Sequence, residues 1–403
     1  FFFSSRRRHT RCSGVSWVGD VYKRQILPPQ LLSGPHHRVR ETVVSYGYMH
    51  HFVVDSDFDV FEVTGDMALQ KLVREISAIA QLREVKKSQA YLDGLKNAAA
   101  QPIEFGTNLL TDPVDTLSGI PKGVSRLFEN VKTGLTTDAG PGEDSKVEQA
   151  LAVSSNKRQL ASKLGVDVYS SNSVLQKELN AVAWATAVGS LSLSVALAPI
   201  GGPAVTAVSV TRVSQQLTEA LRDYPPQRLR QMNQQKLEAM GVSPVLVSQF
   251  LDHQAYTATH ETIIVHSLEG LSGARGRDAF IQQALTTEDE ESANFFMQLA
   301  ETLRGYHSKV SPIKELSTFG PLVFAKASNG SVLIPLPLDR GIWTQRASQR
   351  VPAAFAAYKA ANPGVKKFEV WVTGSLSKMA KEELAKLGAQ VSEDVDKRIE
   401  FVF

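Results

Sequence analysis

Apolar residues recur at every third or fourth position over residues 67–84, and charged residues occupy many of the positions between them. This spacing gives a helix one apolar face and one charged face, so it predicts an amphipathic helix. Leu69, Leu72, Ile76 and Ile79 fall on the apolar face. We therefore expect Leu72 and Ile76 to face a hydrophobic core.

The residues before this helix have the β-branched and aromatic content of strands. His51–Val54 and Asp59–Val63 are two such runs, and the turn-forming residues 55–57 separate them. They predict a β-hairpin that ends at residues 64–66, where the next helix can begin. Residues 26–40 contain three prolines and no period, which predicts an extended lead-in.

From residue 146 to about residue 306 the pattern is helical. The expected helices, separated by Gly, Pro or polar breaks, are 146–163, 173–198, 204–222, 226–240, 243–252, 275–285 and 288–305. The last of them opens with the acids Glu288 to Glu291. Negative charge is favoured at a helix N-terminus, so we assign these acids a structural role.

The period changes again towards the C-terminus. The apolar runs 322–325 and 332–335 flank the turn residues 328–330 and predict a hairpin. The further elements expected here are a strand at 367–372, a helix from Ser377 to Leu387 followed by Gly388, and strands at 389–395 and 398–403.

Together these patterns predict an α+β protein with a mainly helical body, an N-terminal β-hairpin and a small C-terminal α/β module. The expected parts are a non-native segment at 1–25, the lead-in and hairpin at 26–65, the amphipathic helix with Pro/Gly-punctuated short helices at 66–135, a helical domain at 146–310 and the α/β module at 318–403. Residues 134–145 have the composition of a loop.

The first 25 residues, FFFSSRRRHTRCSGVSWVGDVYKRQ, have neither a helical nor a strand period. The whole segment resembles a translated sequencing-adapter artefact. This resemblance implies that the segment is not native. We expect it to make no persistent contact with the rest of the chain.

The net charge depends strongly on this segment. The full sequence has 44 Lys and Arg against 41 Asp and Glu, a net charge of +3. Residues 1–25 contribute six cations and one anion, which leaves 38 against 40, or −2, for residues 26–403. Binding to nucleic acid without sequence preference needs a clustered basic face. We therefore expect no nucleic-acid partner.

The sequence contains few signs of catalytic chemistry. Its one cysteine, Cys12, lies in the first segment, so residues 26–403 cannot form disulfides, zinc–thiolate sites, iron–sulfur clusters or a thiol nucleophile. Neither a nucleophile elbow nor a P-loop occurs. Thr373-Gly374-Ser375 joins a predicted strand to a predicted helix, a geometry that can bind an anion, but an ordinary turn fits it better. We expect no catalytic residue and no cofactor.

Three histidines and a glutamate form the cluster most similar to a metal site. They are His253, His260, Glu261 and His266, in the text HQAYTATHETIIVH. On a helix, residues six positions apart lie on opposite faces, and on a strand they lie about 20 Å apart. Neither geometry makes a chelate, so we expect no metal site there. The pairs His36-His37 and His50-His51 are adjacent, project apart and favour structural or surface roles.

The longest uncharged run, Ala181–Thr211, raises the question of a membrane span. Prolines and glycines interrupt it after residue 198, which leaves 18 residues with only six Leu or Val. About 20 mostly apolar residues are needed to cross a bilayer, so insertion is marginal. We expect a buried hairpin of small-residue helices, packed closely near Gly189. Membrane insertion or surface association is the alternative.

Five blocks of the chain resemble a family of uncharacterised bacterial proteins that consist of a domain of unknown function. They are LLSGPHHRV, ISAIAQLREVKKSQAYLDGLKNAA, NLLTDPVDTLSGIPKGVSRLFENV, DVYSSNSVLQKELNAVAWA and DEESANFFMQLAETLRGYH. In that family the segment similar to LPPQLLSGP follows a secretion signal. The resemblance therefore implies a bacterial protein exported to the periplasm or cell envelope, and it implies no activity.

These observations leave three hypotheses about function. The first is a non-enzymatic interaction protein of the cell envelope, whose partner is unknown and would be a membrane surface or an envelope protein. The second is an enzyme whose site is assembled from distant parts of the chain. The third is a toxin-like membrane-active protein, and it depends on the run 181–211 alone.

Overall fold

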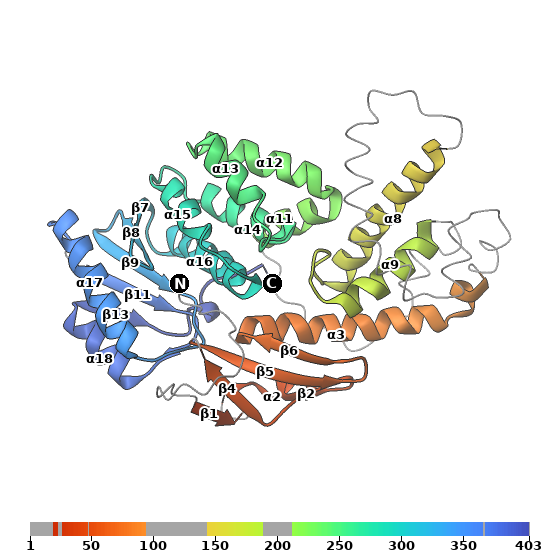
Figure 1. Ribbon diagram of the computed structural model, residues 1–403, viewed down its shortest axis with the longest axis horizontal. Coiled ribbons are helices and arrows are strands. Elements are labelled where there is room, and N and C mark those ends of the chain that lie inside the picture. Colours follow the sequence, from red (N-terminus) through yellow and green to blue (C-terminus); the bar gives the residue numbers. More distant parts are fainter. Residues whose placement is uncertain are drawn as a thin grey trace. The chain divides into compact units, whose positions relative to one another are not determined.

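A computed structural model describes most of the 403 residues. The described residues are 19–22, 26–46, 48–93, 143–187, 212–365 and 367–402. The architecture is mixed α+β, as the sequence predicts, with one sheet near the N-terminus and another near the C-terminus (Figure 1).

The chain divides into two compact units. The first contains residues 1–73, 209–220 and 226–403, and the second contains residues 74–208 and 221–225. The first unit therefore includes both of these sheets, the short parallel pair β10 (Arg340–Gly341) and β12 (Ser375–Leu376), and the helices after residue 226. Its hydrophobic core extends from Met49 to Ile399.

The N-terminal sheet of the first unit has six strands in place of the expected hairpin. They are β1 (Gly19–Tyr22), β2 (Ser33–Gly34), β3 (His37–Val39), β4 (Thr42–Tyr46), β5 (Met49–Ser56) and β6 (Val60–Thr64). The expected hairpin is the β5–β6 pair, which is antiparallel. The lead-in expected at 26–40 is not extended throughout, because the one-turn helix α2 (Pro29–Leu32) precedes its two short strands, β2 and β3.

The first 25 residues contribute a strand to this sheet. Gly19–Tyr22 pairs antiparallel with β4, from Gly19 opposite Ser45 to Tyr22 opposite Thr42. The expectation that this segment makes no persistent contact is therefore wrong at these four residues. Sheet pairing uses backbone N–H and C=O groups, so it does not require a hydrophobic period. Residues 1–18 and 23–25 lie outside the described residues.

The predicted amphipathic helix is α3 (Asp66–Lys87). Gly65, with a positive φ of 101°, turns the chain from β6 into its first residue. Leu72 and Ile76 are buried, with exposed fractions of 7% and 0%. The predicted apolar face is confirmed. The Pro/Gly-punctuated segment up to residue 135, the loop 134–142 and Gly189 lie outside the described residues.

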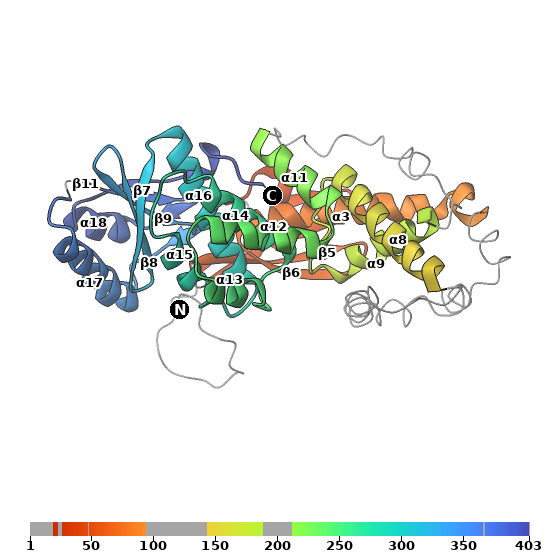
Figure 2. The ribbon, with the colours of Figure 1, turned by 90° about the horizontal axis from the view of Figure 1, so that it is seen from above.

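A group of helices forms much of the first unit's core (Figure 2). Their bounds are α11 (Arg212–Asp223), which extends beyond the unit's limit at residue 220, α12 (Pro226–Ala239), α13 (Pro244–Leu251), α14 (Ala258–Glu269), α15 (Arg277–Ala284) and α16 (Glu290–Lys309). Helix α14 was not among the expected helices. Its β-branched run Thr262–Val265 is helical and largely buried, because Thr257 caps the helix and its apolar residues fill the core on several sides.

The C-terminal sheet has the order β13-β11-β9-β8-β7. Its elements are β7 (Ile313–Phe319), β8 (Leu322–Ala327), β9 (Ser331–Leu336), α17 (Gln345–Ala361), β11 (Lys367–Val372), α18 (Lys378–Lys386) and β13 (Ala389–Ser392). Strands β9, β11 and β13 are parallel, whereas β7, β8 and β9 are joined by antiparallel pairing. Helices α17 and α18 lie on one side of the sheet, and α15 and α16 lie on the other (Figures 1 and 2).

Most of this module follows the sequence pattern, and three parts of it do not. The hairpin, the strand at 367–372 and the helix begun by Ser377 are confirmed. Strand β7 and helix α17 were not expected, and α17 carries Pro352 within it, which masked the helical pattern. The strand expected at 398–403 is wrong, because residues 398–402 have no strand partner.

Residues 398–402 instead form hydrogen bonds with side chains of helix α16. The Val402 N–H donates to Glu301 Oε1 at 2.8 Å, and Lys309 Nζ donates to the Arg398 carbonyl at 3.1 Å. A Cβ atom on Gly305 would lie 2.6 Å from Ile399, so only glycine allows this close approach. Burial raises the pKa of Glu301 to about 7, against the opposing charge of Arg304 and the Val402 hydrogen bond.

We predict that Glu301→Gln changes the pH dependence of stability. A carboxyl group with a raised pKa binds its proton more tightly in the folded chain, so its contribution to stability falls between pH 4.5 and about 7. Glutamine keeps an oxygen for the Val402 N–H but cannot ionise. We expect the variant to gain about 1–3 kcal/mol relative to the wild type between pH 5 and pH 8, measured by urea unfolding. Glu400→Gln on the same segment is the control, and an equal gain there would contradict the assignment.

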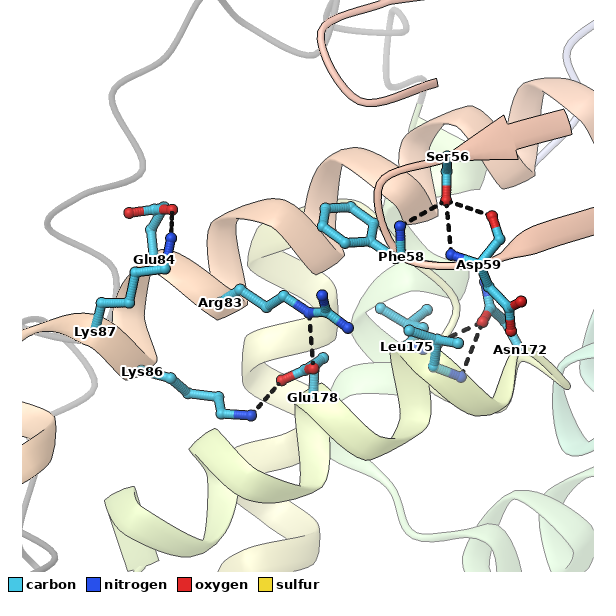
Figure 3. A network of polar contacts seen from close by, with 11 residues as sticks. Ser56, Phe58, Asp59, Arg83, Glu84, Lys86, Lys87, Asn172, Leu175 and Glu178 are labelled. Atoms are coloured by element: carbon cyan, nitrogen blue, oxygen red, sulfur yellow. Dashed lines mark hydrogen bonds and ion pairs between the residues drawn. The ribbon is translucent and has the colours of Figure 1, made fainter. Parts of the chain in front are cut away.

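The second unit contains α8 (Glu143–Leu164), α9 (Ser173–Ala187) and the part of α3 from Arg74 onwards. Glu178 of α9 is buried and accepts hydrogen bonds from Arg83 Nε at 3.1 Å and from Lys86 Nζ at 2.8 Å (Figure 3). Asn172 caps the start of α9, where its side chain accepts from the Leu175 N–H. A buried carboxylate thus joins α3 to α9.

Replacing Glu178 by glutamine is expected to destabilise the second unit by about 1–3 kcal/mol, because the neutral amide removes the negative charge and leaves only one acceptor oxygen for two cationic donors in a buried position. Glu84→Gln is the matched control, since Glu84 and Lys87 form a solvent-exposed pair one turn away. Thermal unfolding measures both variants. Equal shifts in Tm would show that the buried Glu178 contributes no more to stability than the exposed Glu84.

Only Ala181–Ala187 of the long uncharged run belongs to the described residues, as the end of α9. In the described part of the chain, no helix has both the length and the apolarity required to cross a bilayer. The packed hairpin expected at 181–211 stays a prediction.

Candidate functional site

The four side chains that the sequence suggested as a weak metal site lie on or next to helix α14. His260 Nε2 pairs with Asn294 Oδ1 at 3.0 Å, and its Nδ1 belongs to the cap formed by Thr257. His253 Nδ1 accepts from the nearby Ala255 N–H. These hydrogen bonds give both rings structural roles.

The other two members of this set are mostly buried. Burial raises the pKa of Glu261 to about 8 and lowers the pKa of His266 to about 4, so both side chains favour their neutral forms at neutral pH. His266 and His260 lie six residues apart on one helix. None of the four belongs to the group of metal-capable side chains that the described residues bring together.

That group is His50, Asp66 and Asp339, all in the first unit, whose ligand atoms lie within 4.8 Å of one another. His50 is the second residue of β5, Asp66 is the first residue of α3, and Asp339 follows β9. The site therefore joins three elements that are far apart in the sequence.

Hydrogen bonds fix the position of the Asp339 carboxylate. Its Oδ2 accepts the backbone N–H of His50 at 2.8 Å, and its Oδ1 accepts the backbone N–H of Asp66 at 3.2 Å. The imidazole Nδ1 of His50 lies 2.9 Å from Asp66 Oδ1 and 3.9 Å from Asp339 Oδ2. One ring nitrogen thus faces both carboxylates.

The site lies at the carboxyl ends of the parallel strands β9 and β11. The Gly374 and Ser375 N–H groups, which follow β11, donate to the carbonyls of Leu338 and Asp339. A Cβ atom on Gly374 would lie 2.1 Å from the Asp339 carbonyl oxygen, so the two backbones can approach only because residue 374 is glycine. Ligands in sheets with parallel strands bind outside this edge, which gives Asp339 a position typical of a functional residue.

The turn between β4 and β5 contacts the same edge. The Tyr48 carbonyl accepts the Arg340 N–H at 3.0 Å, and the Tyr48 hydroxyl lies 3.0 Å from Thr344 Oγ1. These contacts place His50, two residues after Tyr48, beside Asp339. The N-terminal sheet is therefore attached to the C-terminal sheet around the Asp339 carboxylate.

Burial alters the acid–base properties of this group. It raises the pKa of Asp339 to about 7, and the nearby Asp66 carboxyl adds to the effect. For His50, burial lowers the pKa, but the hydrogen bond and charge of Asp66 and the charge of Asp339 outweigh it, so the pKa is raised overall. The side chains of His50 and Asp339 are 4% and 7% exposed, whereas that of Asp66 is 32% exposed.

This arrangement suits some kinds of chemistry better than others. His50 Nε2 is buried and has no hydrogen-bond partner in the described part of the chain, so it is not placed to take a proton from a substrate. An imidazole nitrogen beside two carboxylates is a ligand set used for divalent metal ions. The site can hold the protein together or hold a cation, and it is less suited to general acid–base catalysis.

Sequence reasoning missed this site, although parts of it were visible. Asp66 was expected to begin a helix, and His50 and His51 were expected to project apart, which they do: His51 Nδ1 pairs with Thr64. Asp339 was not singled out. Asp339 is the first charged residue after the buried apolar strand β9, and this position was the only sign of it in the sequence.

Comparison of the chain with family models, curated proteins and solved structures finds no match.

We predict that Asp339→Asn lowers the free energy of unfolding by about 1.5–3 kcal/mol, because the amide nitrogen of asparagine would face a backbone N–H that now has an acceptor. Asp57→Asn is the control, since Asp57 pairs with His36 at 2.9 Å in an exposed position between strands β5 and β6. Urea unfolding of both variants tests the prediction. A loss for Asp57→Asn as large as that for Asp339→Asn would contradict it.

Proposed function

We propose that this chain is a non-enzymatic protein of the bacterial cell envelope that is exported and acts by binding a partner. The proposal that the protein is not an enzyme is based on the hydrogen bonds that the polar groups of the candidate site form. Both oxygens of Asp339 accept backbone N–H groups, and the free nitrogen of His50 is buried. These groups join two sheets and are not turned towards a substrate.

The exported part of the proposal rests on the sequence. The blocks that resemble a family of uncharacterised bacterial proteins lie between residue 31 and residue 307, so they are spread along much of the chain. The absence of cysteine from residues 26–403 is compatible with an oxidising compartment. The binding partner of an exported protein of this type would be an envelope protein or a membrane surface.

An enzyme with a site assembled from distant residues is the second candidate. One observation favours it: Asp339 lies 289 residues from His50 and 273 residues from Asp66 in the sequence, and it contacts both. The burial of His50 Nε2 speaks against it, because a general base must reach the proton that it removes. The toxin-like candidate depends on residues 181–211, of which 188–211 lie outside the described residues.

Cell fractionation tests the export. The gene is expressed from its own genome with its natural upstream codons and a C-terminal tag, and osmotic shock separates the periplasm from the cytoplasm. We expect the tagged protein in the periplasmic or membrane-associated fraction. The matched control begins at Ile26 behind a start codon, and we expect it in the cytoplasm. Cytoplasmic recovery of both forms would overturn the proposal.

A further inference from the structure

The site at His50, Asp66 and Asp339 has two carboxylates and a single cationic partner. In the described part of the chain, neither Asp66 nor Asp339 forms an ion pair with a lysine or an arginine, and the imidazole of His50 is their only ionic partner. The side chain of Asp339 is 7% exposed. A buried carboxylate is costly unless a positive charge or hydrogen bonds compensate it. The backbone N–H groups of His50 and Asp66 offset part of this cost for Asp339, and one further positive charge would balance the two carboxylates.

We propose that a divalent transition-metal ion, with Zn²⁺ as the reference case, supplies this charge by binding to His50 Nδ1 and to one carboxylate oxygen each of Asp66 and Asp339. Zinc binds histidine nitrogens and carboxylate oxygens, and a site with three protein ligands keeps a water molecule at the fourth position. This inference goes beyond the proposed function, because a metal ion here would serve a binding protein and an enzyme equally.

The distances fit such a site. Two ligand atoms that each lie about 2.1 Å from a tetrahedral zinc ion are about 3.4 Å apart. The Nδ1 atom of His50 lies 2.9 Å from Asp66 Oδ1 and 3.9 Å from Asp339 Oδ2. Adjustments of about half an ångström would equalise the two distances, and rotation of the Asp66 side chain can provide them.

The surroundings support two of the three ligands. Backbone N–H groups orient the Asp339 carboxylate, and the carbonyl of His50 accepts the Gly65 N–H at 2.8 Å, which fixes the backbone around both His50 and Asp66. Asp66 is 32% exposed, so an ion and its water molecule can reach the site from solvent. Ligands on strands and at helix starts keep their positions better than ligands on long loops.

The ring of His50 is the weaker part of the site. Histidines that bind metal ions normally donate their second ring N–H to an acceptor, and losing that acceptor weakens binding by about 10–100-fold. His50 Nε2 has no such acceptor in the described part of the chain. We therefore expect micromolar rather than nanomolar binding.

The experiment measures metal binding and thermal stability on the full chain after treatment with EDTA. Calorimetric titration with Zn²⁺ should give a site that binds one ion, and saturating Zn²⁺ should raise Tm by several degrees, since a ligand that binds only the folded state stabilises it. Mg²⁺ should have no comparable effect, because it prefers an octahedral shell of oxygens. Co²⁺ should show visible absorption bands typical of a nitrogen–oxygen site of low coordination number.

Two aspartate variants separate this site from adventitious binding. Asp66→Asn keeps the backbone N–H that Asp339 accepts and removes one ligand, so we expect at least tenfold weaker binding and no rise in Tm. Asp57→Asn removes the carboxylate from an exposed His–Asp pair with the same 2.9 Å spacing, and we expect it to respond like the wild type. If Asp66→Asn does not fold in EDTA, His50→Gln replaces it.

Three results would overturn the proposal. They are a wild type whose Tm does not respond to Zn²⁺, an Asp66→Asn variant that responds as the wild type does, and an Asp57→Asn variant that loses the response. None of these measurements depends on export, so the outcome is independent of the proposed function.

Discussion

Two backbone N–H groups, those of His50 and Asp66, point at one buried carboxylate, and the arrangement of the first unit depends on this interaction. The N–H of His50 lies at the start of β5 and the N–H of Asp66 at the start of α3, so both would lack an acceptor without Asp339. A buried N–H without an acceptor costs as much as a lost hydrogen bond. The N-terminal sheet, helix α3 and the C-terminal sheet are thereby fixed to one another at a single side chain.

The same carboxylate explains features that otherwise look unrelated. Gly374 leaves room for the Asp339 backbone, and Gly65 allows the sharp turn that presents the Asp66 N–H. The side chain of Asp66 then lies beside the ring of His50. Two carboxylates lie together because the backbone N–H groups of His50 and Asp66 need an acceptor, so the excess of carboxylates at this site follows from its structural role.

Sequence patterns predicted the elements that depend on short-range periodicity. The buried face of α3, the β8–β9 hairpin, β11 and α18 follow from spacings of two or three to four residues, and the fold class follows from their order. Helix α14 was missed because it is apolar on several sides and β-branched, and β1 was missed because its pairing is made by the backbone. The candidate site could not be predicted, since its three side chains meet only through tertiary contacts.

The sequence separation within the site has a consequence for the order of folding. The ribosome adds about 5–20 residues per second, so Asp339 is made about 15–60 s after His50, from which it is 289 residues away. During that interval β5 and β6 can pair, but the carboxylate that accepts the hydrogen bond from the His50 N–H does not yet exist. The N-terminal sheet therefore reaches its final attachment only after strand β9 and Asp339 have been made. Contacts of such long range are slow to form, so the N-terminal sheet is among the last elements to be secured, although its strands are made before the C-terminal sheet.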